Sequence, residues 1–337
     1  MNVVDEVGFV NGSGLAAVGG GRHGRHGCCD RPRLEAGTKG FGRSMTVRAP
    51  RLGVRMSMGD ELIYIMVNGM PGGMALETAE AVARRHTLVP VGLTGADVGV
   101  TSMEIEGNSV ELVRPDERDQ ALKEVKEKYP GVVAIDFTHP TAVNGNVELY
   151  AKYGIDSIIG TTGGDEEAMR EAVMRSSGVY SVIAPNMGKQ IVAFQAMMKS
   201  ISTEFPGCLS GYTMNVVESH QSTKADTSGT AKAVINSFND MGVDFPVDHV
   251  EKVRTEAEQL DRMGVPMKYL KGHAYHTYTL TSPDGTVTLE FKHNVRGRLV
   301  YAEGTVDAAE FLVEKRALGG DQQIFNMIDI LRSGKMQ

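Results

Sequence analysis

A histidine and a lysine stand four residues apart in the polar segment 218–231, which reads Glu-Ser-His-Gln-Ser-Thr-Lys-Ala-Asp-Thr-Ser-Gly-Thr-Ala. The imidazole of His220 has the intrinsic pKa best suited to proton exchange near neutrality. The ammonium group of Lys224 adds a full positive charge and a transferable proton. The two side chains are therefore suited to general acid–base chemistry.

Three small residues at the end of this segment suit an anion. Ser228 supplies the hydroxyl of a helix N-cap, Gly229 leaves the backbone unobstructed, and Thr230 stands at the helix start. Unpaired N–H groups at a helix start attract negative charge. A helix cap after a solvated polar loop explains the same residues equally well, so the segment names no reaction by itself.

Glycines that suit a nucleotide occur near the start of the globular part of the chain. The apolar run 62–67 has the length and composition of a buried parallel strand, and Gly69 and Gly72 follow it directly. Small residues between a strand and a helix let the backbone approach a dinucleotide pyrophosphate. The match to the usual glycine motif is imperfect, because Pro71 stands at its middle glycine, and glycine turns also occur for steric reasons.

The type of nicotinamide cofactor is indicated only weakly. The second predicted strand ends at 91–95, Val-Gly-Leu-Thr-Gly, without the carboxylate that binds the ribose 2′-hydroxyl of NAD and without an arginine. The missing carboxylate favours NADPH over NADH and leaves both open. The loops 137–140 and 160–163 follow later strands and offer threonine hydroxyls and glycine amides to a nicotinamide or ribose, although simple turn chemistry also explains them.

Alternating strand and helix patterns occupy the first half of the globular chain. We expect strands at 62–67, 87–91, 132–137, 155–159 and 179–184, and helices at 74–85, 142–153 and 166–176. Such alternation predicts an α/β fold, a Rossmann-type doubly wound parallel sheet.

The alternation of strands and helices ends after Asn186, and the order of the elements that follow indicates a second, α+β domain. We expect helices at 189–203 and 230–239, strands at 212–218, 274–282, 286–294 and 299–303, and a helical tail over 306–332 that packs on the first domain. The turn residues at 283–285, Pro-Asp-Gly, predict an antiparallel hairpin. The predicted dinucleotide-binding domain is 59–187 plus 304–337, and the predicted substrate-binding and oligomerisation domain is 188–303.

Composition excludes several classes of function. The net charge of −7 gives no support for binding nucleic acid, and no apolar run is long enough for a membrane-spanning helix. Three cysteines, Cys28, Cys29 and Cys208, form neither a disulfide framework nor a metal-binding pattern. The histidines show no zinc-binding spacing either, so we expect no metal site.

Residues 1–58 differ from the rest of the chain. They contain nine Lys or Arg against four Asp or Glu, and subtracting this +5 from the total leaves −12 for residues 59–337. A basic, glycine-rich leader without hydrophobic periodicity favours a transit peptide and a plastid location. Two alternatives stay open, with a cytoplasmic location: a disordered extension, or a true start at Met45, Met56 or Met58.

Several motifs in a fixed order resemble the 4-hydroxy-tetrahydrodipicolinate reductase (dihydrodipicolinate reductase) family in its plant-type form. The resemblance covers about 61–332 and rests on motifs at 67–74, 136–140, 160–163, 184–190, 218–231, 293–298 and 301–305. It implies a Rossmann domain that binds NADPH or NADH and a second domain that binds a cyclic dicarboxylate, with homo-oligomers that are tetramers or dimers.

The resemblance also implies roles for individual residues. His220 and Lys224 would handle protons, and Ser228, Gly229 and Thr230 would bind a substrate carboxylate. The predicted cofactor-binding residues are Gly69, Pro71, Gly72, Gly73, Met74, Thr94, Phe137, Thr138, Gly160, Thr161, Thr162, Ala184, Pro185, Asn186 and Met187.

Two departures from the bacterial form matter for chemistry. Gln221 replaces the second histidine of a His-His pair, and glutamine donates no proton at neutral pH, so the acid role falls on His220 and Lys224. Gly73 replaces a basic residue of the glycine turn, which leaves the choice of cofactor open.

Two rival functions remain. A semialdehyde dehydrogenase of similar size would need a cysteine nucleophile, and Cys208 has no apparent activating partner in the sequence. A non-catalytic nucleotide sensor would not need the proton-handling residues.

Overall fold

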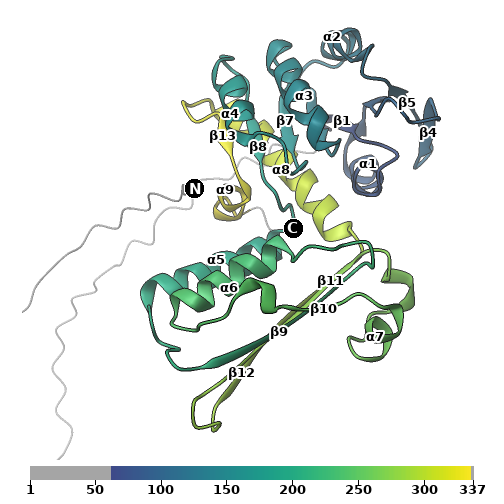
Figure 1. Ribbon diagram of the computed structural model, residues 1–337. Coiled ribbons are helices and arrows are strands. Elements are labelled where there is room, and N and C mark those ends of the chain that lie inside the picture. The colour runs from purple at the N-terminus through teal and green to yellow at the C-terminus, as the bar shows by residue number, and fades with distance from the viewer. Residues whose placement is uncertain (1–61, 335–337) are drawn as a thin grey trace, which may run out of the picture. The chain divides into compact units, whose positions relative to one another are not determined.

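Six parallel strands form the larger sheet of the structure, a computed structural model that describes residues 62–334 (Figure 1). In spatial order they are β13 (Ile324–Phe325), β8 (Ser181–Ile183), β7 (Asp156–Ile159), β6 (Val133–Asp136), β1 (Tyr64–Asn68) and β2 (Thr87–Leu88). The prediction of a leader at 1–58 lies outside the described residues.

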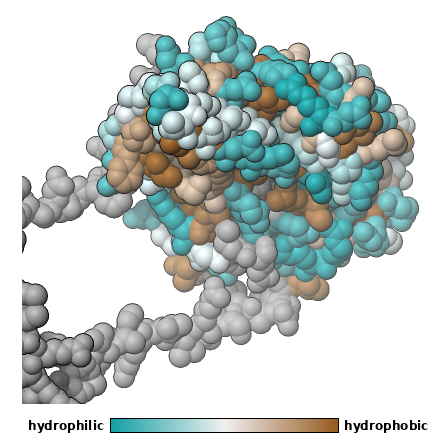
Figure 2. Space-filling view, turned by 90° about the horizontal axis from the view of Figure 1, so that it is seen from below, coloured by the Kyte–Doolittle hydropathy of each residue, from teal (hydrophilic) through white to brown (hydrophobic). Residues whose placement is uncertain are grey.

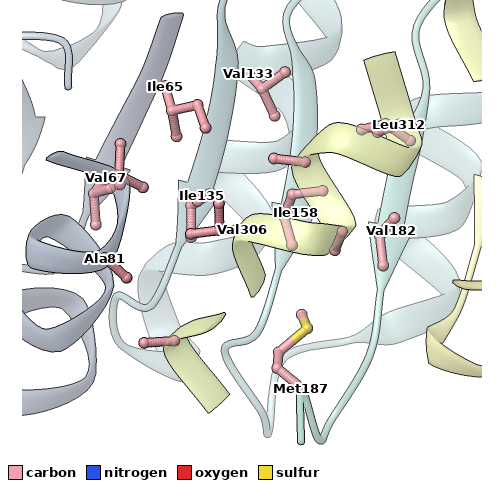
Figure 3. Close-up of a cluster of buried hydrophobic side chains, with 14 of the residues drawn as sticks. Ile65, Val67, Ala81, Val133, Ile135, Ile158, Val182, Met187, Val306 and Leu312 are labelled. Atoms are coloured by element: carbon pink, nitrogen blue, oxygen red, sulfur yellow. The ribbon is translucent and has the colours of Figure 1, made fainter. Parts of the chain in front are cut away.

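Apolar side chains on both faces explain why these strands lie inside the molecule. In β1, Ile65 and Val67 point to one buried cluster, whereas Met66 points to the other. Strands covered on both faces are continuously apolar, as this one is. Figure 3 shows the first cluster, in which Val306 and Leu312 of a helix pack against the strands.

Helices cover both faces of this sheet. One buried cluster includes residues of α1 (Gly73–Arg85), α8 (Leu299–Leu318) and α9 (Met327–Arg332), and the other includes residues of α2 (Arg118–Lys128), α3 (Pro140–Lys152) and α4 (Glu166–Met174). The predicted α/β, Rossmann-type fold class is confirmed.

The prediction of one strand over 87–91 is wrong. The chain forms β2 up to Leu88 and then enters a separate sheet of three strands, which are β3 (Val91–Leu93), β5 (Asn108–Val113) and β4 (Ser102–Ile105). Pro90 separates β2 from β3, and a proline donates no ladder hydrogen bond.

A second sheet carries the segment with the predicted proton chemistry. It contains β10 (Glu251–Val253), β9 (Thr213–His220), β11 (His273–Thr281) and β12 (Thr288–Arg296), in that order. The hairpin predicted at 283–285 is confirmed, because β11 and β12 are antiparallel neighbours. Three further helices belong to this part of the chain, namely α5 (Lys189–Glu204), α6 (Gly229–Asp240) and α7 (Glu256–Asp261).

The strand predicted at 299–303 is also wrong, since these residues begin α8. The helix is buried almost without interruption from Ala302 to Leu312, so its apolar residues show no helical period in the sequence. Tertiary packing outweighs the local preference of Val300 and Tyr301 for a strand. The predicted helical tail also contains an unpredicted strand, β13, between α8 and α9.

The surface mixes polar and apolar residues on the face seen in Figure 2. Among residues 62–334, no helix combines the length and the apolar composition that crossing a membrane requires.

Candidate active site

A cavity of about 480 Å³ lies where strands of the larger sheet end, and we call it the cofactor cavity. In parallel α/β sheets, ligands bind at the carboxyl ends of the strands. Nine predicted cofactor-binding residues line it, namely Met74, Phe137, Thr138, Gly160, Thr161, Thr162, Pro185, Asn186 and Met187. Pro140 and Tyr301 line it as well, without having been predicted as site residues.

The glycine turn shapes the entrance to α1. Gly69 has a φ of +108°, and a side chain there would begin 2.3 Å from the carbonyl oxygen of Phe137. A side chain at Gly72 would begin 2.7 Å from the carbonyl oxygen of Gly69. Only glycine therefore fits either position without displacing backbone.

The first turn of α1 offers donors for a phosphate. The backbone N–H groups of Gly73, Met74 and Ala75 donate no hydrogen bond to any residue of the described part of the chain. No acidic side chain occupies this turn, and the N-cap residue Gly72 makes no side-chain cap. These donors and the positive end of the helix dipole suit a pyrophosphate.

The buried carboxylate of Asp136 at the end of β6 orders two loops around the cavity. It accepts hydrogen bonds from the backbone N–H of Thr138 (3.0 Å) and from the hydroxyls of Thr138 (2.6 Å) and Thr161 (2.9 Å). Its second oxygen accepts from Asn146 (3.0 Å) and Tyr150 (2.8 Å) of α3. Charged hydrogen bonds of this number hold both loops in one geometry.

Six predicted cofactor residues do not line the cavity: Gly69, Pro71, Gly72, Gly73, Thr94 and Ala184. The Thr94 hydroxyl donates to the carbonyl oxygen of Met70 at 2.6 Å, so it supports the glycine turn from behind.

An arginine near the glycine turn was not among the predicted site residues. The Arg298 guanidinium lies 3.5 Å from the point where a side chain at Gly73 would begin, and 3.2 Å from the corresponding point at Gly272. Among residues 62–334, the arginine side chain makes no hydrogen bond or ion pair. The sequence analysis expected a strand at 299–303, whereas Arg298 is the N-cap residue of the helix α8. The place of Arg298 near the glycine turn could therefore not be predicted.

A second group of residues lies on the four-stranded sheet of β9–β12, which we call the smaller sheet to distinguish it from the six-stranded one. We call Glu218, His220, Arg254 and His276 the acid–base cluster. Glu218 and His220 both lie on β9, and His276 pairs with Glu218 in register on β11. The Nε2 atoms of His220 and His276 are 3.2 Å apart. His276 Nε2 lies 3.5 Å from Glu218 Oε2.

Glu218 is ionised at every pH at which the protein would work. Burial alone would raise its pKa, but hydrogen bonds from His276, Arg254 and the Ser228 backbone lower the pKa to about 2. Gln259 of α7 also donates to the carbonyl oxygen of His220 at 2.8 Å. The Glu218 carboxylate therefore joins β9 to the loop before α6, through the Ser228 backbone, and to the side chains of Arg254 and His276.

His220 differs from the sequence expectation, which rested on an intrinsic pKa near neutrality. Burial, together with the charge of His276, lowers the pKa of His220 to about 3. His293, which stacks on His276 with ring centres 4.5 Å apart, also has a pKa lowered to about 3 by burial. In the free protein, both rings are neutral at physiological pH.

Lys224 is held more loosely at the surface. Its Nζ atom lies 2.7 Å from Asp226 Oδ1, and its side chain is 23% exposed. Arg254 donates to its carbonyl oxygen at 2.7 Å, which ties the lysine backbone to the acid–base cluster. Among the described residues, no hydrogen bond or ion pair joins the Lys224 side chain to His220, or either residue to the cofactor cavity.

The start of α6 has the anion-binding features that the sequence predicted. The Ser228 hydroxyl accepts from the Ala231 N–H at 3.1 Å and caps the helix. The N–H groups of Gly229 and Thr230 donate to no described residue, and the space next to Gly229 is open. A carboxylate fits these donors.

Comparisons with known proteins place both halves of the described chain in one family. The family model "Dihydrodipicolinate reductase, N-terminus" matches residues 63–187, and "Dihydrodipicolinate reductase, C-terminus" matches residues 190–331. The chain is 46% identical to 4-hydroxy-tetrahydrodipicolinate reductase 1, chloroplastic, of Arabidopsis thaliana, over 82% of this chain and 79% of that protein. The chain is 47% identical to the probable 4-hydroxy-tetrahydrodipicolinate reductase 1, chloroplastic, of rice (Oryza sativa subsp. japonica), over 81% of this chain and 80% of that protein.

One solved structure supports the fold. The dipicolinate-bound dihydrodipicolinate reductase of Paenisporosarcina sp. TG-14 matches with a TM-score of 0.54 and 16% identity, over 79% of this chain and 98% of that one.

Proposed function

This chain belongs to the dihydrodipicolinate reductase family, and from that premise we propose how its residues divide the work of the reaction. The protein is an oxidoreductase of lysine biosynthesis through diaminopimelate. It reduces the dehydrated form of 4-hydroxy-tetrahydrodipicolinate to tetrahydrodipicolinate with a hydride from NADPH or NADH. The hydride adds electrons to a conjugated ring, which then needs a proton.

For the cofactor, we propose that the pyrophosphate lies on the first turn of α1 and the nicotinamide in the cofactor cavity. The unpaired N–H groups of Gly73 and Met74 support the first position. The loops ordered by Asp136 support the second, because a cofactor ring needs a fixed wall to meet its acceptor. The nucleotide-binding part would be 59–187 with 304–337.

For the substrate, we propose that 188–303 binds it and that the start of α6 grips one carboxylate. The free N–H groups of Gly229 and Thr230 support this proposal. We further propose that Lys224 brings the transferable proton, since burial keeps His220 neutral in the free protein. His220 would become an acid only when the negative carboxylates of the substrate raise its pKa again.

The direct test is consumption of NADPH and of NADH when the product of dihydrodipicolinate synthase is supplied in situ. We expect turnover above a blank with at least one cofactor. No consumption of either cofactor would overturn the reductase function.

The Lys224→Ala variant tests the proton source. We expect kcat to fall by about 100-fold or more, because a positioned general acid contributes that much, while nucleotide binding stays nearly intact. Lys232→Ala, which changes an exposed lysine of α6, is the matched control. Activity of Lys224→Ala within a few-fold of the parent would remove the lysine from the mechanism.

The Arg298 side chain is the strongest candidate for a cationic contact to the cofactor. It supplies at Gly73 the charge that the turn itself lacks, which supports NADPH as the preferred cofactor. Arg298→Ala should weaken NADPH binding about tenfold, and exposed Arg175→Ala should not. An equal loss for NADH would assign the contact to the pyrophosphate, and a loss confined to NADPH would assign it to the 2′-phosphate.

We also propose a homo-oligomer, a tetramer or a dimer, assembled through the smaller sheet. Its edge strand β12 is nine residues long and leaves one side unpaired within the described chain, and an edge of this kind can pair with another copy. Light scattering after size exclusion tests the state, and a monomer at working concentration would contradict the proposal.

The relatives named as chloroplastic support a plastid location with residues 1–58 as the transit peptide. Residues 1–58 fused to a fluorescent protein should enter plastids, and protein that starts at Gly59 should be soluble and active. Cytoplasmic fluorescence, or loss of folding in the shortened protein, would contradict this.

A further inference from the structure

Three potential metal ligands meet inside the acid–base cluster. The Nε2 atoms of His220 and His276 and the Oε2 atom of Glu218 all lie within 4.8 Å of one another. The separations are 3.2 Å between the two nitrogens, 3.5 Å from His276 to Glu218 and 3.9 Å from His220 to Glu218. The sequence spacing concealed this group, because His276 comes from a neighbouring strand.

These separations are close to those that one ion imposes. Zinc binds histidine nitrogen and carboxylate oxygen at about 2.0–2.2 Å, so two ligands in a tetrahedral arrangement lie about 3.3–3.6 Å apart. The triangle in the protein has almost these edges, and only the 3.9 Å edge would have to shorten. A small side-chain movement therefore suffices to bind an ion.

Neighbouring donors hold the Glu218 carboxylate in place. Arg254 holds the other oxygen of Glu218, and the Ser228 backbone N–H donates to Oε2 at 3.1 Å. Glu218 and His276 are almost fully buried, while His220 retains 8% exposure. An ion would reach the group from the side of His220, the most exposed of the three ligands.

The two facing nitrogens also favour a cation. Two imidazole rings whose Nε2 atoms are 3.2 Å apart form a hydrogen bond only when one of these atoms carries the proton. A metal ion accepts both lone pairs at once. Two imidazoles with one carboxylate select zinc, cobalt or nickel rather than calcium or magnesium, which prefer oxygen ligands.

We propose that Glu218, His220 and His276 form a binding site for Zn²⁺ or a similar divalent transition-metal ion, and that the bound ion inhibits the enzyme. Inhibition follows because a metal-bound His220 cannot take up a proton at that nitrogen, so it cannot become an acid when the substrate binds. The metal site itself stands on geometry alone, and only the inhibition rests on the proposed function.

The binding test uses full-length protein freed of metal by a chelator, with Cys28, Cys29 and Cys208 changed to serine so that thiols do not compete. Calorimetric titration with Zn²⁺ and the visible absorption of Co²⁺ are compared between this parent and His276→Gln. We expect at least about tenfold weaker binding and loss of the Co²⁺ spectrum in the variant.

His273→Gln is the matched control. His273 is a buried histidine of the same strand, and its Nε2 atom bonds to the Ser219 hydroxyl instead of the ligand group. This variant should bind both ions like the parent. Thermal melting checks folding, and His220→Gln, at the more exposed ligand, replaces His276→Gln if that variant unfolds.

Equal binding by the parent and His276→Gln, or no binding by the parent, overturns the site. Binding without loss of turnover overturns the inhibition alone. Since calorimetry and absorption need no substrate, a protein without reductase activity would still decide whether the site exists.

Discussion

The cofactor cavity and the acid–base cluster hold their residues by different means. Around the cavity, the chain relies mainly on backbone groups, namely glycines where no side chain fits and free N–H groups at a helix start. One side-chain carboxylate, that of Asp136, orders two loops. Around His220, it relies on buried ionisable side chains that bond to one another. The first arrangement depends on charge at one residue, Asp136, whereas the second makes stability and chemistry depend on the same group of charges.

Of the predicted changes in stability, that of Glu218→Gln should be the largest, because this variant removes a charge on which the acid–base cluster depends. Removing one partner of a buried ion pair leaves Arg254 uncompensated, so we expect a loss of about 3–5 kcal/mol in the free energy of unfolding, measured in urea. Glu251→Gln, in the exposed pair with Arg262, should change little. Equal losses in the two variants would contradict the contrast.

Asp136→Asn should disturb the loops around the cofactor cavity and leave the acid–base cluster unchanged. The amide replaces an oxygen that accepts hydrogen bonds, so we expect a loss of about 1.5–3 kcal/mol in stability and weaker nucleotide binding by fluorescence titration. Asp165→Asn is the control, because asparagine also caps a helix well. Unchanged nucleotide binding in Asp136→Asn would show that the loops hold without it.

A smaller effect should follow from pH. The pKa of His220 and of His293 is about 3 in the folded protein and 6.5 in an unperturbed histidine. Between these values the unfolded chain binds more protons, so stability should fall as the pH is lowered from 6.5 toward 3. The expected slope is at most about 1.4 kcal/mol per pH unit for each histidine.

Urea unfolding between pH 7 and pH 5 measures this slope. His293→Gln should reduce it by the share of one histidine, and exposed His249→Gln should leave it unchanged. A slope that is the same in His293→Gln and the parent would mean that His293 is not neutral in the folded protein.

The same contrast explains what the sequence could predict. Gly69, Met74 and Gly160 belong to short motifs next to strands, so their place at the edge of a parallel sheet followed from local patterns. His276 and Arg254 bond to β9 from distant segments, and their contribution depends on strand register. No local pattern reveals that register.

Burial caused one error in the fold and one in the site. The helix α8 is buried over most of its circumference, so the period that identifies a surface helix was missing and 299–303 resembled a strand. Arg298, at its start, was overlooked for the same reason. The pKa of His220 departed from its intrinsic value because burial, which no motif contains, determines it.

The order of strands in the larger sheet has a consequence for synthesis on the ribosome. Its edge strand β13 and the helices α8 and α9 follow the smaller sheet in the chain, so this sheet stays unfinished until residues 299–332 have been synthesised. The smaller sheet consists of one continuous stretch, 213–296, which emerges earlier. Folding that follows chain emergence would therefore complete the half with the acid–base cluster first, and the nascent nucleotide half would need protection from aggregation for longer.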